Sequence, residues 1–202
     1  MSKKYKITIG IFLVVLFLSA GVIGFYDDNS IADEVFINQM GEEVRLKDFK
    51  DKVVLINFIY TSCPNKGCYL VGMQLLRVQL LLKNRIGKDL FLLSFSIDPE
   101  KDTPEVLREY AKRFKVLDSG GWFFLTGNPE AIDRYRKKHG VVWETGPDGK
   151  RFHRVAVVLL NQKGETEKVY KIKYKTKKIV EDIKALLNNN KMSTVNMKGD
   201  HE

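Results

Sequence analysis

Apolar and polar positions along this chain form blocks that fit either buried strands or amphipathic helices. Three short blocks are almost entirely apolar, as strands buried on both faces are, and they lie at 53–60, 90–97 and 155–160. Longer blocks, several with apolar residues three and four positions apart, are typical of helices. The pattern predicts helices at 69–86, 104–114, 128–139 and 176–187, with a short strand at 122–125.

Local signals support several of these boundaries. Thr103 followed by Pro104 is a favourable N-cap and first-turn pair, so a helix should begin there. A turn inside 35–46 predicts a small hairpin ahead of the main sheet. In the strand expected at 168–175, alternate positions are lysine, which is typical of an exposed sheet edge that is protected against pairing.

Strands that alternate with helices, followed by a closing hairpin and a last helix, predict an α/β sandwich. The chain's two cysteines come at the end of the first central strand, at 53–60, and this position favours a thioredoxin-like fold. We therefore expect a central mixed sheet with helices on its flanks.

The N-terminal segment predicts a membrane anchor. Residues 7–26 carry no charge, and twenty helical residues rise about 30 Å, the thickness of a bilayer's hydrocarbon core. Lysines precede this stretch and aspartates follow it, so the positive-inside rule places the rest of the chain on the extracytoplasmic side, in the bacterial periplasm or its mitochondrial equivalent. A cleaved signal segment is the alternative.

The expected organisation is an anchor at 1–28, a linker at 29–34, a domain at 35–188 and a polar, disordered tail at 189–202. The net charge of +9 would by itself suit a nucleic-acid partner. An exported domain does not meet DNA or RNA, so we predict no nucleic-acid partner.

Cys63 and Cys68 are the only cysteines, with four residues between them. They lie where the predicted strand ends and the predicted helix begins. Unsatisfied backbone N–H groups and the positive end of the helix dipole at such a junction favour a thiolate. Two thiols there suit disulfide exchange or a soft metal ion. A small structural disulfide is the third alternative, although so short a loop gains little entropy from closure.

The chain has three histidines, and His153 stands out because it directly precedes a strand that should lie centrally in the sheet. His139 falls at a helix end and His201 in the polar tail. Two thiolates and one imidazole form a soft set of few ligands that suits Cu(I), with zinc as a competitor.

The exported part resembles the SCO/SenC family of copper proteins along nearly its whole length. The motifs that carry the resemblance are Asn57-Phe58-Ile59-Tyr60-Thr61-Ser62-Cys63-Pro64, Ser96-Ile97-Asp98-Pro99-Glu100-Lys101-Asp102-Thr103-Pro104-Glu105, Leu125-Thr126-Gly127, His139-Gly140-Val141 and the single His153. The resemblance implies a thioredoxin-like fold, an N-terminal anchor, and a role in assembling the copper centre of cytochrome c oxidase.

By position, the resemblance implies that Cys63, Cys68 and His153 bind copper as Cu(I), with Cu(II) as the other oxidation state, and that Asp98 supports the site. The family usually has three residues between its cysteines and a proline after the second. This chain has four, and Tyr69 in place of the proline. We expect the loop to absorb the additional residue at Gly67.

Three functions remain open from the sequence. The first is a membrane-anchored copper-binding assembly factor that passes copper to a protein client, such as an oxidase subunit. The second is a thiol–disulfide oxidoreductase that reduces the client's cysteines, in which Cys63 attacks and Cys68 resolves the mixed disulfide. The third is an interaction domain without redox activity. Whether the protein is an enzyme depends on which of these holds.

Overall fold

The computed structural model describes residues 32–63, 67–116, 120–141, 143–145, 151–153, 156–171 and 175–196. The predicted anchor and the first half of the linker lie outside these residues. Within the part of the chain that is described, no helix is long and apolar enough to cross a membrane.

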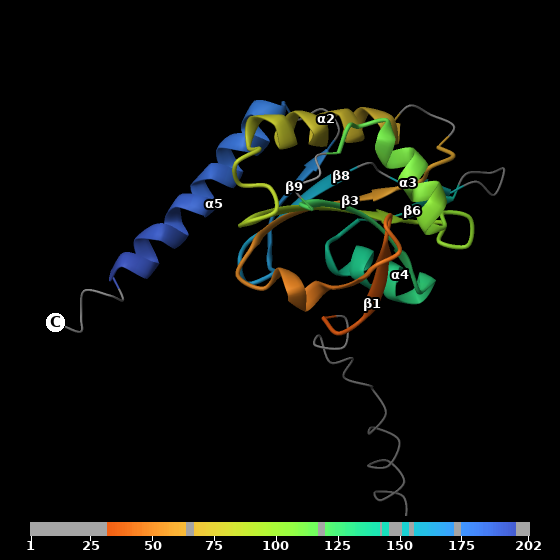
Figure 1. The fold of residues 1–202 in the computed structure, drawn as a ribbon, viewed down its shortest axis with the longest axis horizontal. Helices are drawn as coiled ribbons and strands as arrows, with labels where there is room; N and C mark the ends of the chain where they lie inside the picture. The colour runs from red at the N-terminus through yellow and green to blue at the C-terminus, as the bar shows by residue number, and fades with distance from the viewer. Residues whose placement is uncertain are drawn as a thin grey trace, which may run out of the picture. The chain divides into compact units, whose positions relative to one another are not determined.

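A seven-stranded mixed sheet forms the centre of the domain (Figure 1). The strand order is β2-β1-β5-β4-β3-β8-β9, in which β3, β4 and β5 are parallel and the outer pairs are antiparallel. This arrangement confirms the predicted α/β class with a central mixed sheet. The strands are β1 (Val35–Asn38), β2 (Glu43–Arg45), β3 (Val53–Ile59), β4 (Leu90–Ser96), β5 (Trp122–Gly127), β8 (Ala156–Leu160) and β9 (Thr166–Lys171).

The three parallel strands are central because their side chains are apolar on both faces, and every residue of β3 is buried. Side-chain hydrogen bonds link these three strands in the core. The Ser94 hydroxyl donates to Asn57 Oδ1 (2.7 Å) and accepts from Trp122 Nε1 (3.0 Å), so these buried polar groups are satisfied within the sheet.

Helices cover both faces of the sheet (Figure 1). Side chains of α2 (Gly67–Leu81), α3 (Pro104–Lys112) and α5 (Thr176–Asn196) pack into one apolar core, and those of α4 (Pro129–Lys138) and the short 3₁₀ helix η2 (Leu46–Phe49) pack into the other. Thr103 caps α3 as predicted, since its side chain accepts a hydrogen bond from the Val106 N–H.

The predicted hairpin at 35–46 is confirmed as β1 and β2, and Gly41 in its turn has a φ of 83°. Strand β9 is an edge strand of the sheet, as its lysine pattern indicated. Its Tyr170 is buried against α5, where the hydroxyl donates to Asp182 Oδ2 at 2.7 Å.

The structure differs from the sequence-based expectation at three elements. Helix α2 ends at Leu81 rather than 86, although the later apolar residues Leu82 and Ile86 remain buried. Helix α5 continues to Asn196 rather than ending at 187, and no proline or glycine interrupts the additional stretch.

The third difference is a separate two-stranded sheet that was not predicted. It pairs β6 (Trp143–Thr145) with β7 (Arg151–His153) in antiparallel register, with Trp143 opposite His153. His153 therefore belongs to a hairpin of its own that precedes β8, and is not simply the residue before a central strand.

Candidate metal and thiol site

The two cysteines lie where the sequence placed them, between β3 and α2. The Cys63 N–H donates to the Tyr60 carbonyl at 3.1 Å, which forms a turn directly after the strand. Cys68 is the second residue of α2. Gly67 is the first residue of that helix, and residues 64–66 before it lie outside the described residues, so absorption of the additional residue at Gly67 stays a prediction.

Both cysteines are thiols, and they differ in exposure: Cys63 is half-buried, whereas Cys68 is 1% exposed. Burial, with a smaller contribution from the neighbouring Cys63 thiol, raises the pKa of Cys68 to about 12, although hydrogen bonds from the backbone at Tyr60 and Cys68 act in the opposite direction. The expectation that the helix dipole would favour a thiolate is therefore wrong for Cys68, because burial outweighs it.

A buried carboxylate fixes the start of the cysteine turn. Asp102 is 1% exposed, and its Oδ2 accepts a hydrogen bond from the Ser96 hydroxyl at 2.6 Å. Its other oxygen accepts from the Thr61 hydroxyl, and the Thr61 N–H also points at the carboxylate, at 3.5 Å. Asp102 thus joins the residue two positions before Cys63 to the end of β4.

Asp98, the supporting residue suggested by the resemblance, pairs with a lysine at the surface. Its carboxylate accepts from Lys101 Nζ at 2.9 Å, and the Lys101 side chain is 71% exposed. Its backbone connects to the same network, since the Asp98 N–H donates to Ser96 Oγ at 3.0 Å. A direct role for the Asp98 side chain at the site stays a prediction.

Sequence reasoning missed Asp102, although it lies in the quoted motif. It directly precedes the N-cap Thr103, and its backbone N–H donates to the Asp98 carbonyl at 2.8 Å. This turn directs the Asp102 side chain inward. The available signal was a second aspartate, four positions after Asp98, next to a helix start that Thr103 already caps.

Only the backbone of His153, in β7, is described, so the structure does not place its imidazole relative to the thiols. His139 is separate from the cysteines: it is buried at the end of α4, and its Nδ1 lies 2.7 Å from the Thr166 hydroxyl. His201 is outside the described residues. Among the described side chains no group of three or more His, Cys, Asp or Glu could hold a metal, so the three-residue ligand set stays a prediction.

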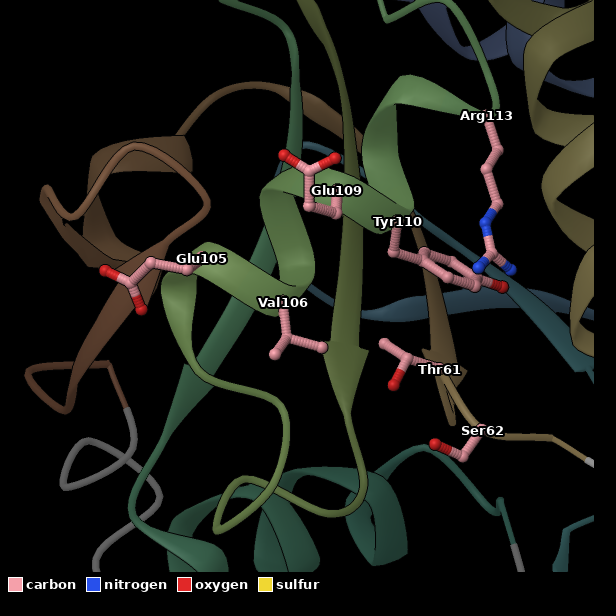
Figure 2. Close-up of a pocket in the computed structure, with 7 residues that line it drawn as sticks. All are labelled: Thr61, Ser62, Glu105, Val106, Glu109, Tyr110 and Arg113. Atoms are coloured by element: carbon pink, nitrogen blue, oxygen red, sulfur yellow. The ribbon is translucent and has the colours of Figure 1, made fainter.

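A cavity of about 380 Å³ adjoins the cysteine turn, between that turn and α3 (Figure 2). Thr61 and Ser62, the two residues before Cys63, form one wall. Helix α3 and the residue after it form the other, through Glu105, Val106, Glu109, Tyr110 and Arg113.

Comparison with known proteins agrees with this architecture. The model of the SCO1/SenC family matches residues 29–188. The chain belongs to the SCO1/SenC family. An SCO2-like protein of Rickettsia typhi is 33% identical over 145 residues, which cover 68% of each chain. The SCO1 homologue of Bacillus subtilis is 31% identical over 138 residues, covering 67% of this chain and 70% of the relative.

Solved structures of SCO proteins share the fold. A SCO1/SenC family lipoprotein of Bacillus anthracis superposes with a TM-score of 0.67 at 28% identity, covering 78% of this chain and 96% of the other. BsSco is described as a cytochrome c oxidase assembly protein with a disulfide switch. It superposes with a TM-score of 0.63 at 26% identity, covering 77% of this chain and 92% of the other. Yeast Sco1 with copper bound superposes with a TM-score of 0.59 at 26% identity, covering 75% of this chain and 86% of the other. The fold is therefore the thioredoxin-like fold of SCO proteins.

Replacing Asp102 should destabilise this SCO domain more than replacing Asp98. Asp102→Ala leaves the hydroxyls of Thr61 and Ser96 without their acceptor, and we expect the free energy of unfolding to fall by about 2–4 kcal/mol. Asp98→Ala removes one ion pair to an exposed lysine and should cost less than about 1 kcal/mol. Urea unfolding of both variants measures this, and equal losses would contradict the assigned role of Asp102.

Alkylation should distinguish the two thiols. At about pH 8, Cys68 is protonated and buried, so we expect iodoacetamide to label Cys63 about tenfold faster or more, as measured by mass spectrometry of the labelled peptides. Raising the pH should speed labelling of Cys68 because its pKa lies near 12. In urea-unfolded protein the two rates should converge. Equal rates in the folded protein would show that burial does not control Cys68.

Proposed function

We propose that this protein is a membrane-anchored copper-binding assembly factor. It would hold Cu(I) through Cys63, Cys68 and His153 and pass it to a protein client. The observation that carries the proposal is the thiol pair, at the strand–helix junction of a chain that belongs to the SCO1/SenC family. The copper-bound yeast Sco1, which has the same fold, supports it.

The chemistry of the thiol pair fits a soft monovalent cation. The Cys63 thiol is near enough to Cys68 to raise its pKa, so the two thiols are neighbours that could share one ligand. Burial disfavours a bare thiolate at Cys68, but a bound Cu(I) would neutralise that charge and remove the penalty. Cys68 would therefore keep its proton until copper binds and release it on loading.

His153 would supply the third ligand, as the resemblance implies. The backbone of His153 lies in the β6–β7 sheet, separate from the main sheet, so this ligand would come from a different element than the cysteines. Two thiolates and one imidazole leave Cu(I) with few ligands, which allows an incoming ligand from a client to exchange for one of them. Zinc could bind the same set as a competitor.

The client we propose is a protein with a copper centre, such as a subunit of a cytochrome c oxidase. The support is the family and BsSco, which is described as a member of a family of cytochrome c oxidase assembly proteins. Transfer by ligand exchange requires direct contact, so the client must reach the half-exposed Cys63 first.

Thiol–disulfide exchange is a second candidate, favoured by the asymmetry of the two thiols. In this function the Cys63 thiolate attacks a client disulfide and forms a mixed disulfide, releasing one client thiolate. Cys68 then attacks the Cys63 sulfur, which frees the second client thiolate and leaves a Cys63–Cys68 disulfide. The more exposed Cys63 and the buried Cys68 suit these roles, and the disulfide switch described for BsSco is consistent with them.

The organisation we propose is an uncleaved anchor at 1–28, a linker at 29–34 and an SCO domain from 35 to 188 on the extracytoplasmic side. The uncharged stretch 7–26 and the charges that flank it carry this part of the proposal.

Replacing His153 should separate the copper role from the redox role. Copper binding uses the imidazole directly, so His153→Ala should weaken Cu(I) binding by several kcal/mol, that is, by orders of magnitude in affinity. Formation of the Cys63–Cys68 disulfide uses only the two sulfurs and should hardly change. Anaerobic Cu(I) titration and the rate of disulfide formation are the two measurements.

His139→Ala serves as the control, since its ring contacts Thr166 and Tyr135 in a different part of the domain. It should leave Cu(I) affinity unchanged. If His153→Ala binds Cu(I) as tightly as the parent, His153 is not a ligand and the oxidoreductase function becomes the better explanation.

Attachment to the membrane has its own test. The full-length protein should stay in the membrane fraction after a carbonate wash, because an uncharged helix of about 30 Å fits the bilayer core. A chain that begins at Asn29 should be soluble. Mature protein that begins shortly after Ala20 and is free in solution would show that the segment is a cleaved signal.

A further inference from the structure

The cavity between the cysteine turn and α3 contains a buried hydrogen-bond donor that the rest of the structure does not use. Tyr110 is 4% exposed, and its hydroxyl has no hydrogen-bond partner among the described residues. Leaving such a group unsatisfied in the protein interior costs about 1–3 kcal/mol, so its position calls for an acceptor from outside.

A cation lies beside this hydroxyl. The Arg113 guanidinium is 5.3 Å from the centre of the Tyr110 ring, and Figure 2 shows the two side chains running toward the same end of the cavity. Arg113 forms no ion pair with the carboxylates that the structure describes. One unpaired positive charge and one unused O–H donor thus face the same space, which suits a negatively charged acceptor.

The cavity's own carboxylates do not fill this role. The Glu109 carboxylate accepts from Lys112 Nζ at 2.5 Å, on the solvent side of α3. The pKa of Glu105 is lowered by hydrogen bonds with its own backbone and with Thr103, at the start of the helix. In Figure 2 both carboxylates point away from Tyr110 and Arg113.

The unused donor is also close to the thiols. Thr61 and Ser62 in the cavity wall lead directly into Cys63. Burial raises the pKa of Tyr110, and the nearby Cys68 and Cys63 thiols raise it further, so the hydroxyl lies within electrostatic reach of both sulfurs. A group bound in the cavity would therefore sit beside whatever reacts at Cys63.

We propose that this cavity binds a carboxylate side chain of the client, next to the client cysteine that approaches Cys63, with Tyr110 Oη and Arg113 as its donors. The proposal names a recognition element of the proposed function and rests on that function. The chain's net charge of +9 favours an acidic partner over longer distances.

A pair of peptides tests this recognition without copper. Each is a short capped peptide with one cysteine, activated as a pyridyl disulfide, and the residue beside the cysteine is Glu in one and Gln in the other. The Cys63 thiolate of the reduced full-length protein, in detergent micelles, attacks the peptide sulfur. A Cys63–peptide disulfide forms, the peptide–pyridyl disulfide breaks, and pyridinethiolate leaves and takes up a proton, which gives the absorbance signal.

We expect the parent protein to react about fivefold faster with the Glu peptide than with the Gln peptide at low salt, and high salt should reduce this ratio. Arg113→Gln and Tyr110→Phe should each lower the ratio about threefold, since each removes one donor to the carboxylate. The rate with the Gln peptide reports the reactivity of Cys63 in each variant, so the ratio of the two rates isolates the effect of the carboxylate.

Two control variants match these changes. Arg77→Gln removes an exposed arginine from α2, and Tyr135→Phe removes a buried tyrosine hydroxyl from α4; neither residue lines the cavity, so both should keep the parent ratio.

A parent ratio near one would overturn the proposal. So would a variant that slows both peptides equally, since Tyr110 or Arg113 would then affect only the thiol. Cu(I) binding is measured separately, so neither result bears on the proposed copper site. A failure to bind Cu(I) would likewise not change the comparison of the two peptides.

Discussion

The buried carboxylate of Asp102 is the contact on which the geometry of the cysteine turn depends. The turn leaves β3 after Ile59, and within it the Cys63 N–H donates to the Tyr60 carbonyl. Asp102 binds it at Thr61 and binds the end of β4 at Ser96, so two parallel neighbouring strands and the start of α3 hold the turn together. A charge buried to this degree is stable only when its hydrogen bonds are complete, and the chain supplies them with two hydroxyls.

A second constraint acts on Cys68. A cysteine in the first turn of a helix is usually expected to be acidic, but this one is enclosed by the core and keeps its proton. In the proposed function, a bound cation would offset the energy that burial takes from the bare thiolate. In both proposed functions, the more exposed Cys63 would be the first point of contact for a client.

The sequence predicted the sheet, the helices and the position of both cysteines, because uniformly apolar strands and helix caps such as Thr103 are local signals. It did not predict the β6–β7 hairpin, whose three-residue strands are too short for a clear period. It also selected Asp98 rather than Asp102, since burial of a charge depends on how the turn folds back. The unused Tyr110 hydroxyl could not be found from sequence either: in the helix pattern it is simply one more core position.

The central claim is that copper is held by two sulfur atoms and one imidazole nitrogen in one chain. X-ray absorption spectroscopy of the Cu(I)-loaded full-length protein measures this set directly, because it counts sulfur and nitrogen neighbours of the metal. The account predicts two sulfur scatterers and one nitrogen scatterer with the imidazole pattern, and the loss of that nitrogen in His153→Ala. A copper site with sulfur neighbours alone, the same in parent and variant, would contradict it.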